Sequence, residues 1–179
     1  MDANGSASAS SSAPQGSSED VIFQRFDPAR LPELMTWFPD AKQCRTWGGD
    51  FRFPFTPDSF REDSSMDEIA SWSLVDDDAA LAAFGQCYVR LERCHFGRRA
   101  VSPSMRGSGL GTRLIRELTA WGLAEFGDRE LSLFVEQSNE RAYHLYLRLG
   151  FREVHYPGEQ SPFMANSRYM IATGLRQGP

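Results

Sequence analysis

The sequence predicts one mixed α/β domain, with a single sheet of about six or seven strands and helices on both faces. Three observations support this prediction. The expected elements run strand, helices, three strands, helix, strand, helix and two strands, with no internal repeat. A length of 179 residues suffices for one core but hardly for two. A glycine-rich turn at 106–111 joins a strand to a long amphipathic helix.

The two ends of the chain are expected to lie outside this domain. Residues 1–19 are mostly Ser, Ala and Gly, with no apolar periodicity. Such a segment buries too little apolar surface to offset the entropy of ordering it. We therefore predict a disordered tail at 1–19, a folded domain at 20–175 and a short C-terminal tail at 176–179.

The N-terminal half of the domain is expected to combine short strands with short helices. Apolar periodicity and turn residues predict strands at 21–26, 69–75, 81–91 and 94–101, helices at 28–38 and 41–46, and a helical turn at 58–68. Two prolines within 51–57 predict an irregular loop rather than an edge strand. Aromatic residues near this loop are assigned to the core, with a substrate-facing wall as the alternative: Trp47, Phe51, Phe53 and Phe55.

The helix that follows the glycine turn is expected at 108–126. Leu110, Leu114, Leu118 and Trp121 recur at helical spacing on one face, and Gly127 is a suitable end. The first N–H groups of a helix lack intrahelical acceptors, and the helix dipole attracts anions to that end. Glycines in the turn remove side chains that would keep a phosphate away from those N–H groups, so the turn suits anion binding.

The C-terminal part of the domain is expected to contribute three strands and one helix. Apolar runs predict strands at 130–135, 151–156 and 168–173, the last two around a loop that contains Pro and Gly. Ser138 or Asn139 is expected to cap the helix, and Gly150 to end it. The apolar stripe of this helix comprises Ala142, Leu145, Tyr146 and Leu149.

Composition and motif spacing argue against several classes of protein. A formal net charge of −5 is unlike a general nucleic-acid binder, and no run approaches the ~18 apolar residues of a membrane span. The sequence shows no signal-peptide core and no transit-peptide arginines near residue 1. Three cysteines without a CxxC pair predict reduced thiols in a cytoplasmic protein, without a zinc site. The glycine turn lacks the Walker A lysine and the GxGxxG spacing of a dinucleotide fold.

Two motifs stand in a defined order along the chain. The first is Arg106-x-x-Gly109-x-Gly111, and the second, one strand later, is Asn139-x-x-Ala142-x-x-x-Tyr146-x-x-x-Gly150-Phe151. Together they resemble the pyrophosphate loop and the second signature of the GNAT superfamily of acetyl-CoA-dependent N-acetyltransferases. The resemblance extends over about 20–175, is weakest at 36–68, and implies a central sheet that is splayed in the middle.

The resemblance also implies a site for acetyl-CoA as co-substrate, with no metal ion. The pyrophosphate is expected to contact Arg106, Gly107, Ser108, Gly109, Leu110, Gly111 and Thr112. The pantetheine arm is expected to run along Ala100 and Val101 and to contact Asn139, while Tyr146 protonates the leaving thiolate. From the residues alone, Tyr146 is equally suited to core packing and Asn139 to helix capping.

His95 is the candidate general base for the attacking amine. Aligned from the glycine loop, it falls where some members of the superfamily carry a glutamate base, and an imidazole pKa near ~6.5 suits proton acceptance at neutral pH. A histidine at the start of a strand also serves structural roles, and water is the alternative proton acceptor. Tyr88 and Glu92 are further candidates.

The function implied by the resemblance is transfer of an acetyl group from acetyl-CoA to a primary amine of a small molecule or protein. The alternative is a catalytically silent acyl-CoA-binding sensor with the same fold. The expected partner is a small-molecule or peptide amine rather than nucleic acid or a membrane, and a homodimer is left open. Acidic residues within 58–68 suit either attraction of a cationic amine or a solvated helix face.

Overall fold

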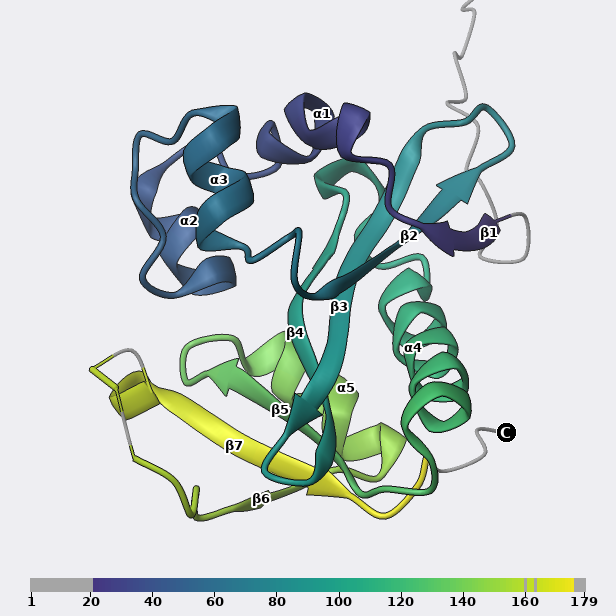
Figure 1. Cartoon of the computed structure of the whole chain (residues 1–179), viewed down its shortest axis with the longest axis vertical. Coiled ribbons are helices and arrows are strands. Elements are labelled where there is room, and N and C mark those ends of the chain that lie inside the picture. The colour runs from purple at the N-terminus through teal and green to yellow at the C-terminus, as the bar shows by residue number, and fades with distance from the viewer. Residues whose placement is uncertain (1–20, 160, 163, 176–179) are drawn as a thin grey trace, which may run out of the picture.

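The computed structural model describes residues 21–159, 161–162 and 164–175. Within them lies one seven-stranded sheet in the order β1-β2-β3-β4-β5-β7-β6, which confirms the predicted mixed α/β class (Figure 1). The tails predicted at 1–19 and 176–179 lie outside the described residues.

The elements follow the predicted order along the chain. They are β1 (Val21–Arg25), the 3-10 helix η1 (Pro28–Arg30), α1 (Leu31–Met35), α2 (Ala41–Gly48), α3 (Pro57–Asp63), β2 (Ala70–Asp76), β3 (Leu81–Arg90), β4 (Arg93–Val101), η2 (Pro103–Met105), α4 (Leu110–Phe126), β5 (Leu131–Glu136), α5 (Glu140–Leu149), β6 (Arg152–Val154), η3 (Met164–Asn166) and β7 (Ser167–Ala172).

The sheet consists of two antiparallel parts joined by one short parallel contact. Strands β1 to β4 pair antiparallel in sequence, and β5, β7 and β6 form a second antiparallel group. The contact between them is the parallel pair β4 and β5, as predicted, and its last matched residues are Phe96 and Leu133. Beyond that point the two strands are no longer paired, although β4 continues to Val101 and β5 to Glu136. We call this separation the split.

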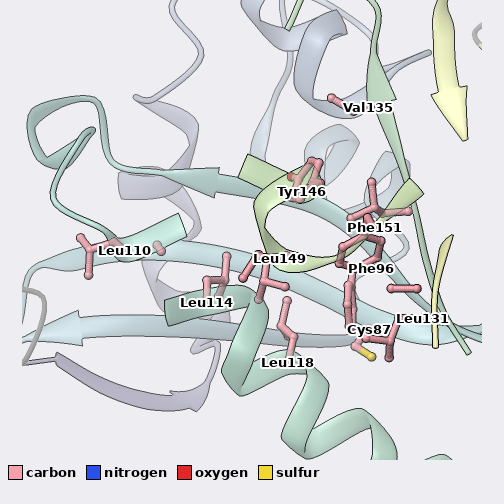
Figure 2. Packing of buried hydrophobic residues seen from close by; sticks show 14 of the residues in the cluster. Cys87, Phe96, Leu110, Leu114, Leu118, Leu131, Val135, Tyr146, Leu149 and Phe151 are labelled. Carbon is pink, nitrogen blue, oxygen red and sulfur yellow. The ribbon is translucent and has the colours of Figure 1, made fainter. Parts of the chain in front are cut away.

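One face of the sheet is covered by α4 and α5. Leu114 and Leu118 of α4 share a buried cluster with Leu149 of α5, and Figure 2 shows these side chains directed toward one another. The helix α4 approaches β3 and β4 closely at Gly122. A Cβ at this position would collide with the thiols of Cys87 and Cys94, so the close approach requires glycine. Those two thiols are themselves buried and lie 3.2 Å apart.

The opposite face is covered by α1, α2 and α3, which Figure 1 shows on the other side of β3 from α4. Their cluster is aromatic. Trp47 stacks on Phe38 with ring centroids 4.3 Å apart and on Phe60 at 5.3 Å, and Phe84 of β3 lies 5.9 Å from Trp47. The two helical layers therefore cover opposite faces of the sheet, and the split lies between β4 and β5.

Some predicted elements are shorter in the structure. The helix expected at 28–38 is divided into η1 and α1 and ends at Met35, because Trp37 and Phe38 turn into the aromatic cluster. The helical turn expected at 58–68 ends at Asp63, and the strand expected at 151–156 spans only Arg152–Val154. The core assignment of Phe53 is wrong, because its side chain is 39% exposed beside Phe55.

Candidate active site

A cleft of about 1210 Å³ opens at the split. The glycine turn and α5 line one end of it, and β3, β4 and the segment around α2 line the other. Eleven of the twelve residues that the sequence assigned to the site lie on its wall: His95, Ala100, Val101, Arg106, Gly107, Gly109, Leu110, Gly111, Thr112, Asn139 and Tyr146. The twelfth, Ser108, is exposed outside the lining residues, and its hydroxyl donates to the carbonyl of Met105 at 2.7 Å.

The glycine turn has the backbone shape that an anion site at a helix N-terminus requires. Gly107 and Gly109 have φ of 98° and 90°, in the left-handed region that favours glycine. Gly109 is the N-cap of α4, and its carbonyl accepts from the N–H of Thr112 at 2.9 Å. The N–H groups of Leu110 and Gly111, before it, precede the intrahelical ladder. A Cβ on Gly107 would lie 3.1 Å from Nη2 of Arg141, which brings a second cation to this end of the cleft.

The edge of β4 that faces the split lies open beyond Phe96. Ala100 and Val101 pair with β3 on their other side and line the cleft, as the resemblance implied for the pantetheine arm. The carbonyls of Phe96 on β4 and Phe134 on β5 are both bound by the guanidinium of Arg99, the latter at 2.6 Å. Arg99 thus supplies hydrogen bonds to carbonyls at the place where the two strands separate.

Tyr146 faces the cleft from α5 and is bound by the same guanidinium. Its side chain is 5% exposed and packs against Phe151 (Figure 2). Nε of Arg99 donates to the Tyr146 hydroxyl at 3.0 Å, and the guanidinium lies 5.3 Å from the ring centroid. Because the phenolic oxygen accepts from Arg99, its own proton is free to be donated into the cleft. Tyr146 therefore packs in the core and also presents its hydroxyl at the wall of the cleft.

Asn139 likewise serves as a cap and lines the cleft. Its Oδ1 accepts from the N–H of Ala142 at 3.2 Å, which caps α5. The oxygen is therefore engaged, and the side-chain NH2 group is left as a donor.

His95 lies on the wall of the cleft but is almost fully buried, at 3% exposure. Its Nδ1 is hydrogen-bonded to the hydroxyl of Ser132 at 2.9 Å, and its ring lies 5.1 Å from that of Tyr88. Burial, reinforced by the positive charges of Arg99, Arg90 and Arg98, holds the pKa of His95 well below its ordinary value. The imidazole is therefore neutral at neutral pH.

The other proton-acceptor candidates fall in different places. Tyr88 lines the cleft, whereas the side chain of Glu92 is 91% exposed at the β3–β4 turn and pairs with Arg129. Three of the five carboxylates in the acidic segment 58–68 are paired with arginines. Arg52 binds Glu62 and Asp63, and Arg61 binds Asp67.

Sequence reasoning missed the arginines of this site. Arg90, Arg98 and Arg99 all line the cleft near His95, and Arg141 and Arg148 line it from α5. The doublet Arg98-Arg99 near the end of a largely buried strand was the available signal, since guanidinium groups placed there must find partners inside the domain. In the part of the chain that the structure describes, no cluster of His, Cys, Asp and Glu could hold a metal ion, and no helix is long and apolar enough to cross a bilayer.

The split sheet, the glycine turn at a helix N-terminus and the buried tyrosine in one cleft define an α/β protein built to hold an extended, phosphate-bearing ligand. The family model described as Acetyltransferase (GNAT) family matches residues 32–151. The chain therefore belongs to this family, and the predicted family and fold are confirmed.

Individual relatives agree with this assignment. Spermidine N(1)-acetyltransferase of Escherichia coli (strain K12) is 37% identical over 62 residues, which is 32% of this chain and 33% of the relative. The chain thus spans about a third of the length of this curated relative in the match. A solved spermidine N-acetyltransferase from Vibrio cholerae, in complex with CoA and spermine, shares the fold with a TM-score of 0.67 at 17% identity, over 88% of this chain and 96% of that one. A GNAT-family acetyltransferase from Staphylococcus aureus Mu50 gives 0.64 at 12% identity, over 85% and 98%.

Proposed function

We propose that the protein is an acetyl-CoA-dependent N-acetyltransferase that acts on the primary amine of a small molecule. One observation carries this proposal: a tyrosine hydroxyl with a free proton lies in the same cleft as a glycine turn suited to a pyrophosphate. Family membership supports the reaction class, and the spermidine N-acetyltransferases among its relatives support a small-molecule amine.

The residues of the cleft fit acetyl-CoA. Gly107 and Gly109 keep the turn before α4 free of side chains, and Arg106 and Arg141 add positive charge there. Gly111 lets α4 pack closely against Leu145. Bound in the cleft, acetyl-CoA would supply a thioester whose carbonyl carbon accepts the amine.

Two side chains are proposed to handle the protons. Tyr146 donates its free proton to the departing sulfur, and Arg99 keeps the phenolic oxygen oriented for this. His95 is neutral and can accept a hydrogen bond from the attacking amine through the ring nitrogen that Ser132 does not use. Because its pKa is low, His95 is a weak final acceptor, and we propose that the proton passes on to water.

We also propose that the protein works in the cytoplasm. All three cysteines are free, and the thiols of Cys87 and Cys94 lie 3.2 Å apart without forming a disulfide. Such a pair persists as thiols in a reducing compartment.

A thiol-release assay with acetyl-CoA tests the proposed function. The full chain is incubated with panels of polyamines, amino acids, aminoglycosides and peptides, and CoA affinity is measured separately by calorimetry. An acetyltransferase releases CoA with at least one amine and forms the acetylated product. The sensor alternative binds CoA but gives no amine-dependent release with any acceptor.

A further inference from the structure

Three arginines surround His95 at the acceptor end of the cleft, and we infer that the amine acceptor carries an anionic group, a carboxylate or a phosphate, that binds to them. Arg90, Arg98 and Arg99 are together called the arginine wall. The inference rests on the proposed function and narrows its substrate class.

The arginine wall comes from two adjacent strands. Arg90 is the last residue of β3, and its guanidinium lies 5.5 Å from the ring centroids of both Phe134 and Tyr156. Phe134 in turn lies 5.5 Å from the ring of His95. The guanidinium of Arg98, on β4, lies 5.4 Å from the ring centroid of Phe51. The wall therefore flanks the position where the amine must stand to reach His95.

Within the described residues, the wall is bound by neutral groups. Arg90 donates to the hydroxyl of Tyr156 at 2.9 Å, and Arg99 to the hydroxyl of Tyr146. Arg98 donates to Oε1 of Gln86 at 2.7 Å and to the main-chain carbonyl of Asp63 at 2.9 Å. These hydrogen bonds hold the guanidinium groups in place, and none of them is an ion pair. The carboxylate of Asp63 also acts on the charge of Arg98, but it is shared with Arg52, which binds it directly.

Other arginines of the same domain are paired with carboxylates. Arg93, on the same strand, binds Glu130 at 2.9 Å, and Arg129 binds Glu92 at 3.0 Å. The wall therefore differs from these paired arginines. An uncompensated charge that is partly removed from water is costly, and a bound anion would relieve that cost.

Arg98 is the member of the wall best suited to hold the anion. Burial lowers the pKa of its guanidinium, so its charge is held away from solvent. Its Nε is buried and has no hydrogen-bond partner among the described residues. A carboxylate or phosphate would balance the charge of this guanidinium and give it a counter-ion.

Four of the described residues on the cleft wall are carboxylates, and one of them, Asp63, is paired with an arginine. Among the described lining residues, Asp63 is held by Arg52, Asp40 caps α2, Glu136 accepts from Ser138, and Asp50 is exposed after α2. The positive field that disfavours a proton on His95 also disfavours a second ammonium group beside it. The wall therefore favours an amine that brings its own negative charge.

Matched acceptor pairs test this inference. Tyrosine is compared with tyramine, histidine with histamine, and phosphoethanolamine with ethanolamine, and spermidine is included as the polycation. We expect kcat/KM to be about 10- to 100-fold higher for the anionic member, the range of a hydrogen bond to a charged group. The amino acids and phosphoethanolamine separate the carboxylate from the phosphate as the source of the anion.

One wall variant and one control variant test where the anionic group of the acceptor binds. In Arg98→Gln, KM for the anionic member should rise about 10-fold, and the preference within each pair should shrink by the same factor. Arg93→Gln, on the same strand but outside the cleft lining, should keep the preference of the wild type. Melting temperatures show whether each variant is folded, and Arg90→Gln repeats the test if Arg98→Gln is not.

The possible outcomes distinguish a failure of the anionic-acceptor inference from a failure of the proposed N-acetyltransferase function. Faster acetylation of spermidine, or of the amines that lack an anionic group, would overturn the anionic acceptor and leave the N-acetyltransferase standing. An unchanged preference in folded Arg98→Gln and Arg90→Gln would overturn the role of the arginine wall. CoA binding without turnover of any acceptor would overturn the proposed function itself, and the inference with it.

Discussion

The two ends of the cleft are formed by different groups of the chain, main-chain groups at one end and side chains at the other. At the end proposed for the cofactor, the cleft is lined by glycines and by the N-terminus of α4, with its main-chain N–H groups. At the acceptor end, the contacts come from side chains of β3, β4 and the region around α2. The geometry of a site made of main-chain groups is set by a few consecutive residues. The geometry of a site made of side chains depends on how distant parts of the chain pack together. The comparison leads to four predictions, from the largest expected effect to the smallest.

Tyr146 lies where the two ends meet, and its hydroxyl has the largest expected effect. Tyr146→Phe should lower kcat by roughly 10²-fold, because general acid catalysis contributes that much, with CoA affinity nearly unchanged. The loss should shrink with an acyl donor whose leaving thiol is more acidic. Tyr143→Phe, on the same helix but outside the cleft lining, is the matched control. Undiminished turnover in Tyr146→Phe would remove the catalytic assignment.

Arg99 links the split to Tyr146, so its replacement affects both. Arg99→Met removes the donor to the hydroxyl and the hydrogen bonds to the carbonyls of Phe96 and Phe134. We expect kcat to fall about 10-fold, the scale of one hydrogen bond to a charged group, and the melting temperature to fall as well. An acyl donor with a more acidic leaving thiol tests how Arg99 acts. If this donor restores turnover in Tyr146→Phe but not in Arg99→Met, Arg99 affects only the fold.

Gly109 tests the cofactor end by itself. An alanine with φ near 90° is strained by about 1–2 kcal/mol, and its methyl group also obstructs the anion site. We expect Gly109→Ala to lower the melting temperature and to weaken CoA binding about 5-fold. Gly127→Ala, at the far end of α4 with φ of 83° and open space around a Cβ, should lose stability without losing CoA affinity. Equal CoA affinity in both variants would show that the turn does not bind the cofactor.

His95 gives the smallest effect, which appears as a pH dependence of stability. Its folded pKa lies below the unfolded value near ~6.5, so below that pH the unfolded chain binds a proton that the folded chain does not. This contribution to stability is present above about pH 6.5 and is lost as the pH falls, with a slope of at most about 1.4 kcal/mol per pH unit. Urea unfolding from pH 7.5 to 5.5 should show a flatter profile in His95→Gln. Identical profiles would mean that His95 is not held neutral by the fold.

The same contrast explains what could be predicted from the sequence. The order of the elements along the chain follows from local periodicity. The parallel neighbours β4 and β5 and the places of Gly109, Asn139 and Tyr146 on the cleft wall follow from the resemblance that two short motifs carry. Helix capping and positive φ are properties of a few adjacent residues, so their residue types indicate them.

The acceptor end could not be predicted in this way. That Arg99 reaches Phe134 and Tyr146, 35 and 47 residues away, depends on the separation of two strands that no local pattern records. The aromatic residues of 47–55 were also ambiguous. Trp47 and Phe51 both pack in the core and line the cleft, whereas Phe53 is exposed. Apolar type alone does not distinguish these positions.

The short parallel contact between β4 and β5 has a consequence for how the molecule opens. With three matched residue pairs from Cys94 to Phe96, the sheet resembles two leaves joined by a narrow seam. The main-chain hydrogen bonds at the seam are few, so the leaves are held together mainly by the buried cluster that they share with α4 and α5. A molecule that bound across the seam would hold the leaves together and slow amide hydrogen exchange in both at once. The cosubstrate would then complete the sheet as well as react in it.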